Sequence, residues 1–316
     1  MKPTTKTRRR TAASKSSPAP EARPQPAIGS GAGRLRVALA QIAPALGDRQ
    51  RNAEKHRQQI DEAAAAGADL VVFPELSLTG YYLRDMVPEV ALERTSREIE
   101  ELVERAGSLA LVAGFVEESA GHHFYNAGFF SQAGRLLHVH RKVYLPTYGL
   151  FEEQRYFSAG KRFSAFDAPG FGRVGLVICE DLWHVSAATI MQAEEVDLLV
   201  WVINSPARGM DGSDIRTAET YKLLARSYAQ LLGALVVLVN RVGFEDGLCF
   251  FGNSLVVGPD GQILGEAPQF DECLLTVSCD LAELRRQRLI TPLGRDEQLL
   301  LTIEELERIK RRRYEE

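Results

Sequence analysis

Short apolar runs alternate with amphipathic stretches along most of this chain. Residues 34–42 and 68–73 are apolar runs that predict strands, and the stretch around residues 52–65 between them predicts a helix. The second run is apolar at consecutive positions, which is typical of a strand that helices bury on both faces of a sheet. A β-α-β order is therefore expected at the start of the folded region.

The rest of the chain continues this alternation. Long helices are predicted over residues 89–106, 187–195 and 214–232. Strands are predicted over residues 109–115, 125–130, 136–142, 173–178, 196–203, 235–240, 250–257, 262–266 and 274–279, and the second and third of these form a predicted hairpin. Many strands with few long helices indicate an α/β fold in which two mixed sheets pack face to face between helices, a four-layer α-β-β-α sandwich.

The length of the chain bounds its domain organisation. With 316 residues, 45% of them hydrophobic, it can bury the core of one catalytic domain, which we expect over residues 35–290. Residues 291–316 form a predicted C-terminal extension with a charged helix, because glutamates precede basic residues at helical spacing. Residues 1–34 form a basic tail, which we expect to be disordered because it has no apolar periodicity.

Charge is distributed unevenly along the sequence. The formal net charge is -4, but residues 1–34 hold eight Lys and Arg against one Glu, and the remainder holds 30 basic and 41 acidic residues. An acidic body offers no footprint for nucleic acid, so none is expected as a partner. No signal-type apolar stretch follows the basic start and no segment approaches membrane-spanning length, so we expect a cytoplasmic protein without membrane contact.

Cysteines and histidines give no sign of a metal site. The four cysteines have no CxxC spacing, so neither a disulfide framework nor a zinc knuckle is expected; they are Cys179, Cys249, Cys273 and Cys279. His138 and His140 share one face of a predicted strand, but no third ligand stands at a suitable spacing. We therefore predict no bound metal.

Three reactive side chains stand at or just beyond the ends of apolar runs: Glu75, Lys142 and Cys179. Ligand sites of α/β sheets gather at strand ends, so a carboxylate, an ammonium and a thiol can meet there as a covalent amide-hydrolysing site. Each also has a plain structural explanation, as a solvated turn carboxylate, a solvated lysine and an inert buried cysteine. The aromatic-rich loop of residues 144–157 favours a pocket wall beside Lys142.

Cys179 precedes two carboxylates and a predicted helix. Backbone N–H groups and the helix dipole at that point are expected to lower the pKa of the thiol, whereas Glu180 and Asp181 oppose this and require a cationic partner such as Lys142. His184 is an alternative partner for a Cys/His hydrolase. The GxGxxG pattern at residues 170–175 precedes a strand instead of following one, so dinucleotide binding is not expected.

Several motifs, in fixed order, resemble the nitrilase superfamily of carbon–nitrogen hydrolases. They are FPELSLTGY at 73–81, RKVYLP at 141–146, FEEQRYF at 151–157, ICEDLW at 178–183, NRVG at 240–243 and FGNS at 251–254. The resemblance covers residues 35 to about 290. It implies the four-layer sandwich, a homodimer or larger homo-oligomer, and a Glu-Lys-Cys site that uses no metal or organic cofactor.

The resemblance also implies roles for individual residues. Cys179 would attack the amide carbonyl and carry a thioester, Glu75 would act as base and acid, and Lys142 would stabilise the oxyanion.

Further positions match the family around these three. Glu153 falls where the family places a second glutamate, with Glu152 as the competing assignment. Tyr81, Tyr148 and Glu180 resemble substrate-pocket positions of the glutaminases.

The resemblance is strongest to the glutaminase domain of glutamine-dependent NAD synthetases, through LTGY at 78–81, LPTYGLF at 145–151 and CEDLW at 179–183. The sequence has no SGGxDS-type loop of an ATP-using domain, so a free-standing hydrolase is expected. Residues 204–209 are shorter than the glutaminase pattern, and the NRVG and FGNS motifs resemble amidases and carbamoylases.

We therefore expect a hydrolase that cleaves a small-molecule amide and releases ammonia or an amine. Two alternatives remain, a glutaminase subunit that feeds ammonia to a separate synthetase and an N-carbamoyl amine hydrolase. Nitrile hydrolysis uses the same three residues, but Ile178 and Glu180 beside the cysteine resemble the amidase branches.

Overall fold

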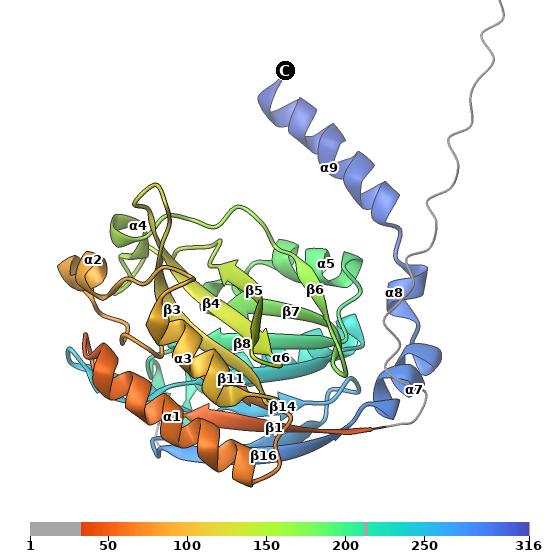
Figure 1. Ribbon diagram of the computed structural model, residues 1–316. Helices are drawn as coiled ribbons and strands as arrows, with labels where there is room; N and C mark the ends of the chain where they lie inside the picture. Colours follow the sequence, from red (N-terminus) through yellow and green to blue (C-terminus); the bar gives the residue numbers. More distant parts are fainter. Residues whose placement is uncertain (1–32, 212–213, 316) are drawn as a thin grey trace, which may run out of the picture.

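Two six-stranded sheets form the centre of the molecule (Figure 1). The computed structural model describes residues 33–211 and 214–315, so most of the predicted basic tail lies outside the described residues. The first sheet has the order β16 (Cys273–Asp280), β1 (Arg34–Gln41), β2 (Leu70–Val72), β3 (Ala110–Glu118), β4 (Phe124–Gln132) and β5 (Arg135–Arg141). In it β1, β2 and β3 are parallel, and β4 with β5 forms the predicted hairpin.

The second sheet has a parallel centre and antiparallel edges. Its order is β15 (Ile263–Glu266), β14 (Leu255–Val257), β11 (Leu235–Asn240), β8 (Leu198–Ile203), β7 (Gly172–Ile178) and β6 (Ala165–Ala168). The strands β7, β8 and β11 run parallel, so their carboxyl ends lie at one edge.

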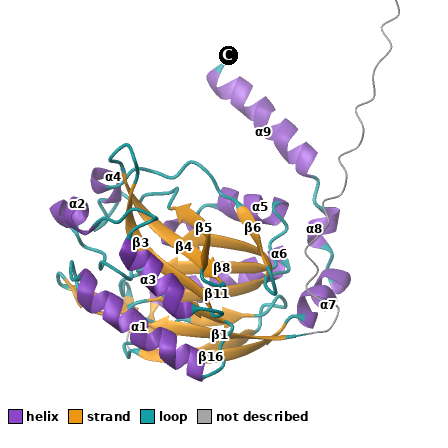
Figure 2. Cartoon of the chain, in the orientation of Figure 1, coloured by secondary structure: helices purple, strands orange, loops and turns teal. Residues whose placement is uncertain are grey.

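Helices cover the outer face of each sheet (Figure 2). On the first sheet, α1 (Arg49–Ala65) and α3 (Arg97–Ala106) bury Ile60, Leu102 and their neighbours. On the second, α5 (Val185–Ala193) and α6 (Arg216–Leu232) pack into the main core, which also fills the space between the sheets. The predicted four-layer α-β-β-α sandwich is confirmed.

Local sequence explains why these layers form. Asp48 caps α1 by accepting a hydrogen bond from the backbone N–H of Arg51 at 3.0 Å, and the buried positions of the helix recur at a helical spacing. In β2, Val71 faces the helices while Leu70 and Val72 face the other sheet. Both faces of β2 are buried, as its consecutive apolar residues predicted.

Two predicted elements are wrong in extent. The helix expected over residues 89–106 is divided into α2 (Val87–Val90) and α3, because Ala91 is extended and Leu92 bridges to β3 at Glu117. The strand expected over residues 250–257 is divided into β13 (Leu248–Phe251) and β14, because Gly252 and Asn253 have φ values of 71° and 59°. The strand β13 instead pairs with β12 (Val242–Glu245).

Five further elements are only two to five residues long. They are η1 (Arg84–Met86), α4 (Glu153–Tyr156), η2 (Cys179–Trp183), β9 (Met210–Asp211) and β10 (Asp214–Ile215).

The chain continues beyond β16 through α7 (Ala282–Ile290), α8 (Leu293–Asp296) and α9 (Leu299–Tyr314). In Figure 1, α9 projects away from the sandwich. Within the described residues, no helix combines the length and the apolar character needed to cross a bilayer.

Candidate active site

Glu75 is fully buried just beyond the end of β2. Its Oε1 accepts hydrogen bonds from Asn126 Nδ2 at 2.7 Å and from Lys142 Nζ at 2.8 Å, and its Oε2 accepts one from the backbone N–H of Asn204 at 2.7 Å. The next residue, Leu76, has a φ of 45°, so the chain turns sharply at this carboxylate. Three donors from separate parts of the chain therefore fix the orientation of the Glu75 carboxylate.

Lys142 is also buried and lies between two carboxylates. Its Nζ donates to Glu75 Oε1 at 2.8 Å and to Glu153 Oε1 at 2.6 Å. Burial alone lowers the pKa of this lysine, but the charges of Glu153 and Glu75 outweigh burial and raise the pKa well above its ordinary value. The ammonium form is therefore favoured.

Glu153 begins α4 and faces inward, whereas Glu152 is exposed. Besides the ammonium, its Oε1 accepts a hydrogen bond from the Tyr81 hydroxyl at 2.6 Å. Burial and then the charge of Glu75 raise the pKa of Glu153 to about 7, although Lys142 opposes this. Two carboxylates share one ammonium, so one of them is drawn towards protonation. Of the two glutamates, the fold brings Glu153 to the cluster.

Cys179 follows the end of β7, which belongs to the second sheet. Its φ is 44°, and its carbonyl accepts a hydrogen bond from Trp201 Nε1 at 2.9 Å. The Sγ atom lies 3.5 Å from the Tyr221 hydroxyl. The charges of Glu75 and Lys142 both act on the thiol, so the three side chains lie in one site.

The expected lowering of the thiol pKa is wrong. Burial, and next the charge of Glu75, raise the pKa of Cys179, and the opposing effect of Lys142 is smaller. The helix dipole expected to oppose this rise does not act there, because the short η2 follows Cys179 directly and the longer α5 begins only at Val185. The thiol is therefore protonated near neutral pH.

Strand pairing explains how the two sheets meet at this point. Ile178 pairs with Val202 in parallel register, so Cys179 lies beside the end of β8. Two residues farther along, Asn204 donates its backbone N–H to Glu75 from the first sheet. The site thus lies where strand ends of both sheets converge.

The other predicted pocket residues divide into two groups. Tyr81 is buried and acts on Glu153, as described above. Tyr148 is 52% exposed, and its hydroxyl donates to Glu180 Oε1 and Oε2 at 2.9 and 3.0 Å. Burial and then Glu180 raise the pKa of Tyr148 to about 12, and the charge of Cys179 contributes, which places this pair beside the thiol.

The alternatives weighed from the sequence are not brought together. His184 stacks on Tyr144 at a centroid distance of 3.6 Å, and its Nε2 lies 3.9 Å from Glu180 Oε1. Within the described residues, no group of three or more His, Cys, Asp or Glu side chains is arranged to hold a metal ion. All four cysteines are free.

Several residues of the site were missed from the sequence. Asn126 lies inside β4 and Asn204 follows β8, and both hold Glu75. Glu245 accepts the backbone N–H groups of Tyr81 and Tyr82 at 2.9 and 2.6 Å and forms an ion pair with Arg241. In the sequence, each of these residues is only a polar position within or beside an apolar run. Such a position does not show which residue it will contact.

Comparison with known proteins places this chain in a family. Residues 36–289 match the carbon-nitrogen hydrolase family. The chain belongs to this family.

Relatives of this carbon-nitrogen hydrolase include longer proteins. The glutamine-dependent NAD(+) synthetase of Acinetobacter baylyi is 30% identical over 254 residues, which cover 80% of this chain and 46% of the relative. The solved glutamine-dependent NAD+ synthetase of Acinetobacter baumannii superposes with a TM-score of 0.71 at 30% identity, covering 80% of this chain and 47% of that chain. The chain thus spans about half the length of these relatives.

Free-standing proteins share the fold as well. An amidase from Nesterenkonia sp. superposes with a TM-score of 0.68 at 25% identity, covering 83% of this chain and 95% of that chain. This carbon-nitrogen hydrolase is therefore similar to about half of the longer synthetases and to almost the whole chain of an amidase.

Proposed function

We propose that this protein hydrolyses the carbon–nitrogen bond of a small amide through a thioester on Cys179. The observation that carries the proposal is the buried pairing of Lys142 with Glu75 and Glu153, with their charges acting on the Cys179 thiol. A buried ion cluster of this kind costs free energy, so its position beside a strained cysteine supports a catalytic use over a structural one.

Glu75 is the general base in this scheme. The surroundings of Cys179 raise the pKa of its thiol, so Cys179 cannot attack as a preformed thiolate at neutral pH. Glu75 takes the thiol proton as the sulfur–carbon bond forms, and it passes that proton to the leaving nitrogen as the carbon–nitrogen bond breaks. It then takes a proton from water as the water oxygen attacks the thioester, and it returns this proton to the sulfur as the carbon–sulfur bond breaks and the acid leaves.

Lys142 supplies charge to the developing oxyanion. An ammonium has three N–H donors, and two of them bond to Glu75 and Glu153. The third is available for the carbonyl oxygen of a substrate held at Cys179. Loss of one such donor in other acyl-transfer sites costs about 10² to 10³ in turnover.

Glu153 positions the ammonium and can also receive the substrate. Its Oε2 is buried, and no hydrogen-bond partner for it occurs in the described part of the chain. An amide N–H of the substrate would satisfy this oxygen. The Tyr81 hydroxyl holds the other oxygen, so Tyr81 acts on the substrate through Glu153.

A wall of mixed charge favours amides of amino acids as substrates. Glu180 offers a carboxylate beside Cys179, and Tyr148 orients it. The guanidinium of Arg208 lies 5.1 Å from the centre of the Phe151 ring, which itself packs against Tyr148. A carboxylate and a guanidinium on one wall complement the ammonium and carboxylate of an amino acid.

Glutamine is therefore the first candidate substrate. The similarity to glutamine-dependent NAD synthetases supports the same choice. On this proposal, the protein is a glutaminase that releases ammonia to solution or to a separate ATP-using synthetase. Simple aliphatic amides and N-carbamoyl amines are the alternatives for the same chemistry.

Ammonia release from a panel of glutamine, asparagine, aliphatic amides, N-carbamoyl amines and nitriles tests the proposal. We expect Cys179→Ala to lower turnover by at least about 10³-fold without a change in thermal unfolding. Cys249→Ala is the matched control, since Cys249 is a second free cysteine, and it should retain activity. Full activity in Cys179→Ala would refute the thioester scheme.

Glu180→Gln then separates the substrate classes. We expect it to raise KM for glutamine and to leave the turnover of an aliphatic amide unchanged, because glutamine carries an ammonium group and an aliphatic amide does not. Turnover of aliphatic amides with glutamine inert would establish a free-standing amidase.

A further inference from the structure

A hollow of about 330 Å³ lies at the edge strand β5, beside the loop of residues 159–164. Its walls include both histidines of β5, His138 and His140, together with Lys161, Arg162 and Ser164. Among the described residues that line it, every charged side chain is basic. The hollow is separate from the wall formed by Tyr148 and Glu180.

The hollow carries excess positive charge. Lys161 and Arg162 are exposed, and in the described ranges of the chain neither forms an ion pair with a carboxylate. Arg141 bonds to Glu117 at 2.7 and 2.9 Å, but the same carboxylate also pairs with Arg94, so one negative charge serves two guanidinium groups. Such a concentration of positive charge is notable because residues 35–316 are net acidic.

His138 adds a donor without a partner. Its Nε2 is buried, and no hydrogen-bond partner for it occurs within residues 33–211 and 214–315. The ring stacks on Phe166 at a centroid distance of 4.5 Å, which fixes its orientation. Burial, then the charges of His140 and Arg94, lower its pKa to about 4. A neutral imidazole still has one N–H to donate to an anion.

We propose that this hollow binds the phosphate group of a small molecule. Lys161 and Arg162 have no carboxylate partners, so their two positive charges match the two negative charges of a phosphate. A carboxylate ligand would neutralise only one of the two cations. The Ser164 hydroxyl and the His138 ring supply further polar contacts. A volume of about 330 Å³ lies within the range of small-molecule sites.

The hollow adjoins the backbone beside Lys142, because Arg141 and Gly160 both line it. The backbone N–H of Gly160 donates to the carbonyl of Lys142 at 2.8 Å. A Cβ at Gly160 would lie 2.1 Å from the Arg141 carbonyl oxygen, so the loop is tightly packed against the strand. A phosphate that draws Lys161 and Arg162 inward therefore acts on the backbone that carries the lysine.

A second connection passes through His140. Its Nε2 bonds to Asp181 Oδ2 at 2.8 Å, and Asp181 lies two residues beyond Cys179. A ligand in the hollow can therefore affect the Cys179 thiol through the buried pair of His140 and Asp181. This step, unlike binding itself, rests on the proposed function.

Calorimetric titration of the full chain with inorganic phosphate and with a nucleoside monophosphate tests the binding. We expect saturable binding that Lys161→Ala/Arg162→Ala weakens at least tenfold. Arg135→Ala/Arg285→Ala removes the same charge from exposed sites outside the hollow and should leave the affinity unchanged. Binding of the nucleotide alone would show that the hollow needs the nucleoside as well as the phosphate.

Two outcomes would overturn the proposal. One is an absence of saturable binding of either compound, and the other is equal weakening by the two double variants, which would mean general charge attraction. Because these titrations need no turnover, they stand even where the proposed amide hydrolysis fails.

The rate of Cys179 alkylation by iodoacetamide tests the connection to the site. We expect saturating ligand to change this rate in the wild type and to leave it unchanged in Lys161→Ala/Arg162→Ala. An unchanged rate in the saturated wild type would show that the hollow is not coupled to the thiol.

Discussion

Asp181 links the two halves of the candidate site at the scale of a single residue. The side chain is fully buried, and its Oδ1 accepts the backbone N–H groups of Val143 and Tyr144, both at 3.0 Å. Its Oδ2 accepts the backbone N–H of Ile178 at 3.0 Å and contacts His140. One carboxylate therefore holds the chain just after Lys142 and just before Cys179.

We predict that Asp181→Asn lowers kcat at least tenfold with a smaller change in KM. The amide has one acceptor oxygen in place of two, so the N–H of Ile178 would face another donor, at a cost of about 1–3 kcal/mol. Steady-state kinetics and thermal unfolding of the variant measure both effects. A purely structural role would lower the melting temperature and leave kcat of the folded enzyme unchanged.

Asp167→Asn is the control for this substitution. Asp167 is exposed and pairs with Arg173 at 3.2 Å, so its loss should change neither kcat nor stability appreciably. Equal losses in both variants would contradict a positioning role for Asp181.

The convergence of individual residues of the candidate site was predictable where a strand pattern ended at them. Glu75, Lys142 and Cys179 each follow an apolar run, and the fold brings all three together. The thiol pKa was not predictable, because its direction depends on burial and on the distance to Glu75. Asn126 and Asn204 were missed for a related reason: each reaches Glu75 from a different part of the chain.

At the scale of elements, β3 supports the turn that carries Glu75. The backbone N–H of Gly114 in β3 donates to Ser77 Oγ at 3.1 Å, and the carbonyl of Gly114 accepts the N–H of Leu78 at 3.0 Å. A Cβ at Gly114 would lie 2.3 Å from Leu76 N and 2.7 Å from Pro74 O. Only a glycine allows the turn to approach so closely.

We predict that Gly114→Ala displaces this turn and with it the Glu75 carboxylate. Overpacking of this kind costs about 1–3 kcal/mol, and a misplacement of about 1 Å can lower turnover about 10²-fold. Thermal unfolding and kcat measure the two effects.

The matched control is Gly294→Ala, because nothing lies within 4 Å of a Cβ at Gly294. It should retain both stability and activity. Wild-type turnover in Gly114→Ala would show that the turn tolerates the displacement, and the role given to β3 would be wrong.

Elements defined by their own apolar pattern were predicted correctly, whereas boundaries set by tertiary pairing were not. The consecutive apolar residues of β2 were sufficient, because both of its faces are buried. The break after Val90 depends on a tertiary bridge from Leu92 to Glu117, and the break after Phe251 depends on a change of pairing partner. Neither is encoded in local periodicity.

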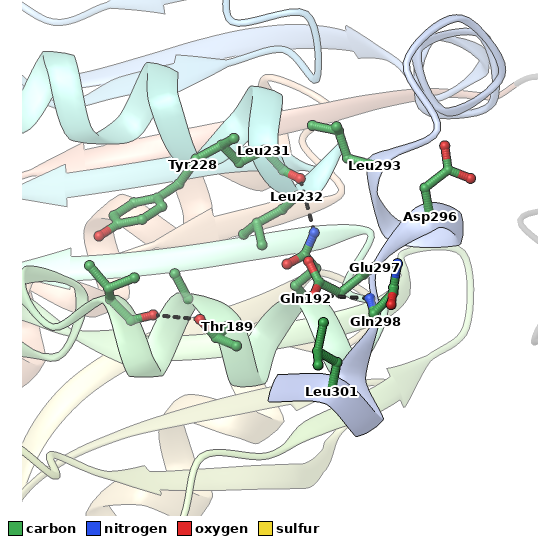
Figure 3. Close-up of a pocket in the computed structure, with 12 residues that line it drawn as sticks. Thr189, Gln192, Tyr228, Leu231, Leu232, Leu293, Asp296, Glu297, Gln298 and Leu301 are labelled. Carbon is green, nitrogen blue, oxygen red and sulfur yellow. Dashed lines mark hydrogen bonds between the residues drawn. The ribbon is translucent and has the colours of Figure 1, made fainter. Parts of the chain in front are cut away.

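At the scale of the whole molecule, a large apolar surface stays uncovered. More than half of the exposed large hydrophobic side chains in the described residues lie on α5, α6 and the C-terminal helices. A hollow of about 530 Å³ separates α5 and α6 from the C-terminal segment, and Figure 3 shows Leu231, Leu293 and Leu301 around it. In α9, no residue is buried, although Leu299, Ile303 and Leu306 follow a helical stripe.

We predict that a second copy of the chain covers this surface. A 16-residue helix with no buried residue is marginal in water, so α9 requires a partner to bury its stripe. Ile303→Gln/Leu306→Gln should therefore lower the assembly mass in sedimentation velocity and leave the sandwich folded. Arg312→Gln/Arg313→Gln changes the same helix without touching the stripe and should keep the mass. A full-length protein that sediments as a monomer, or equal masses for both variants, would contradict this arrangement.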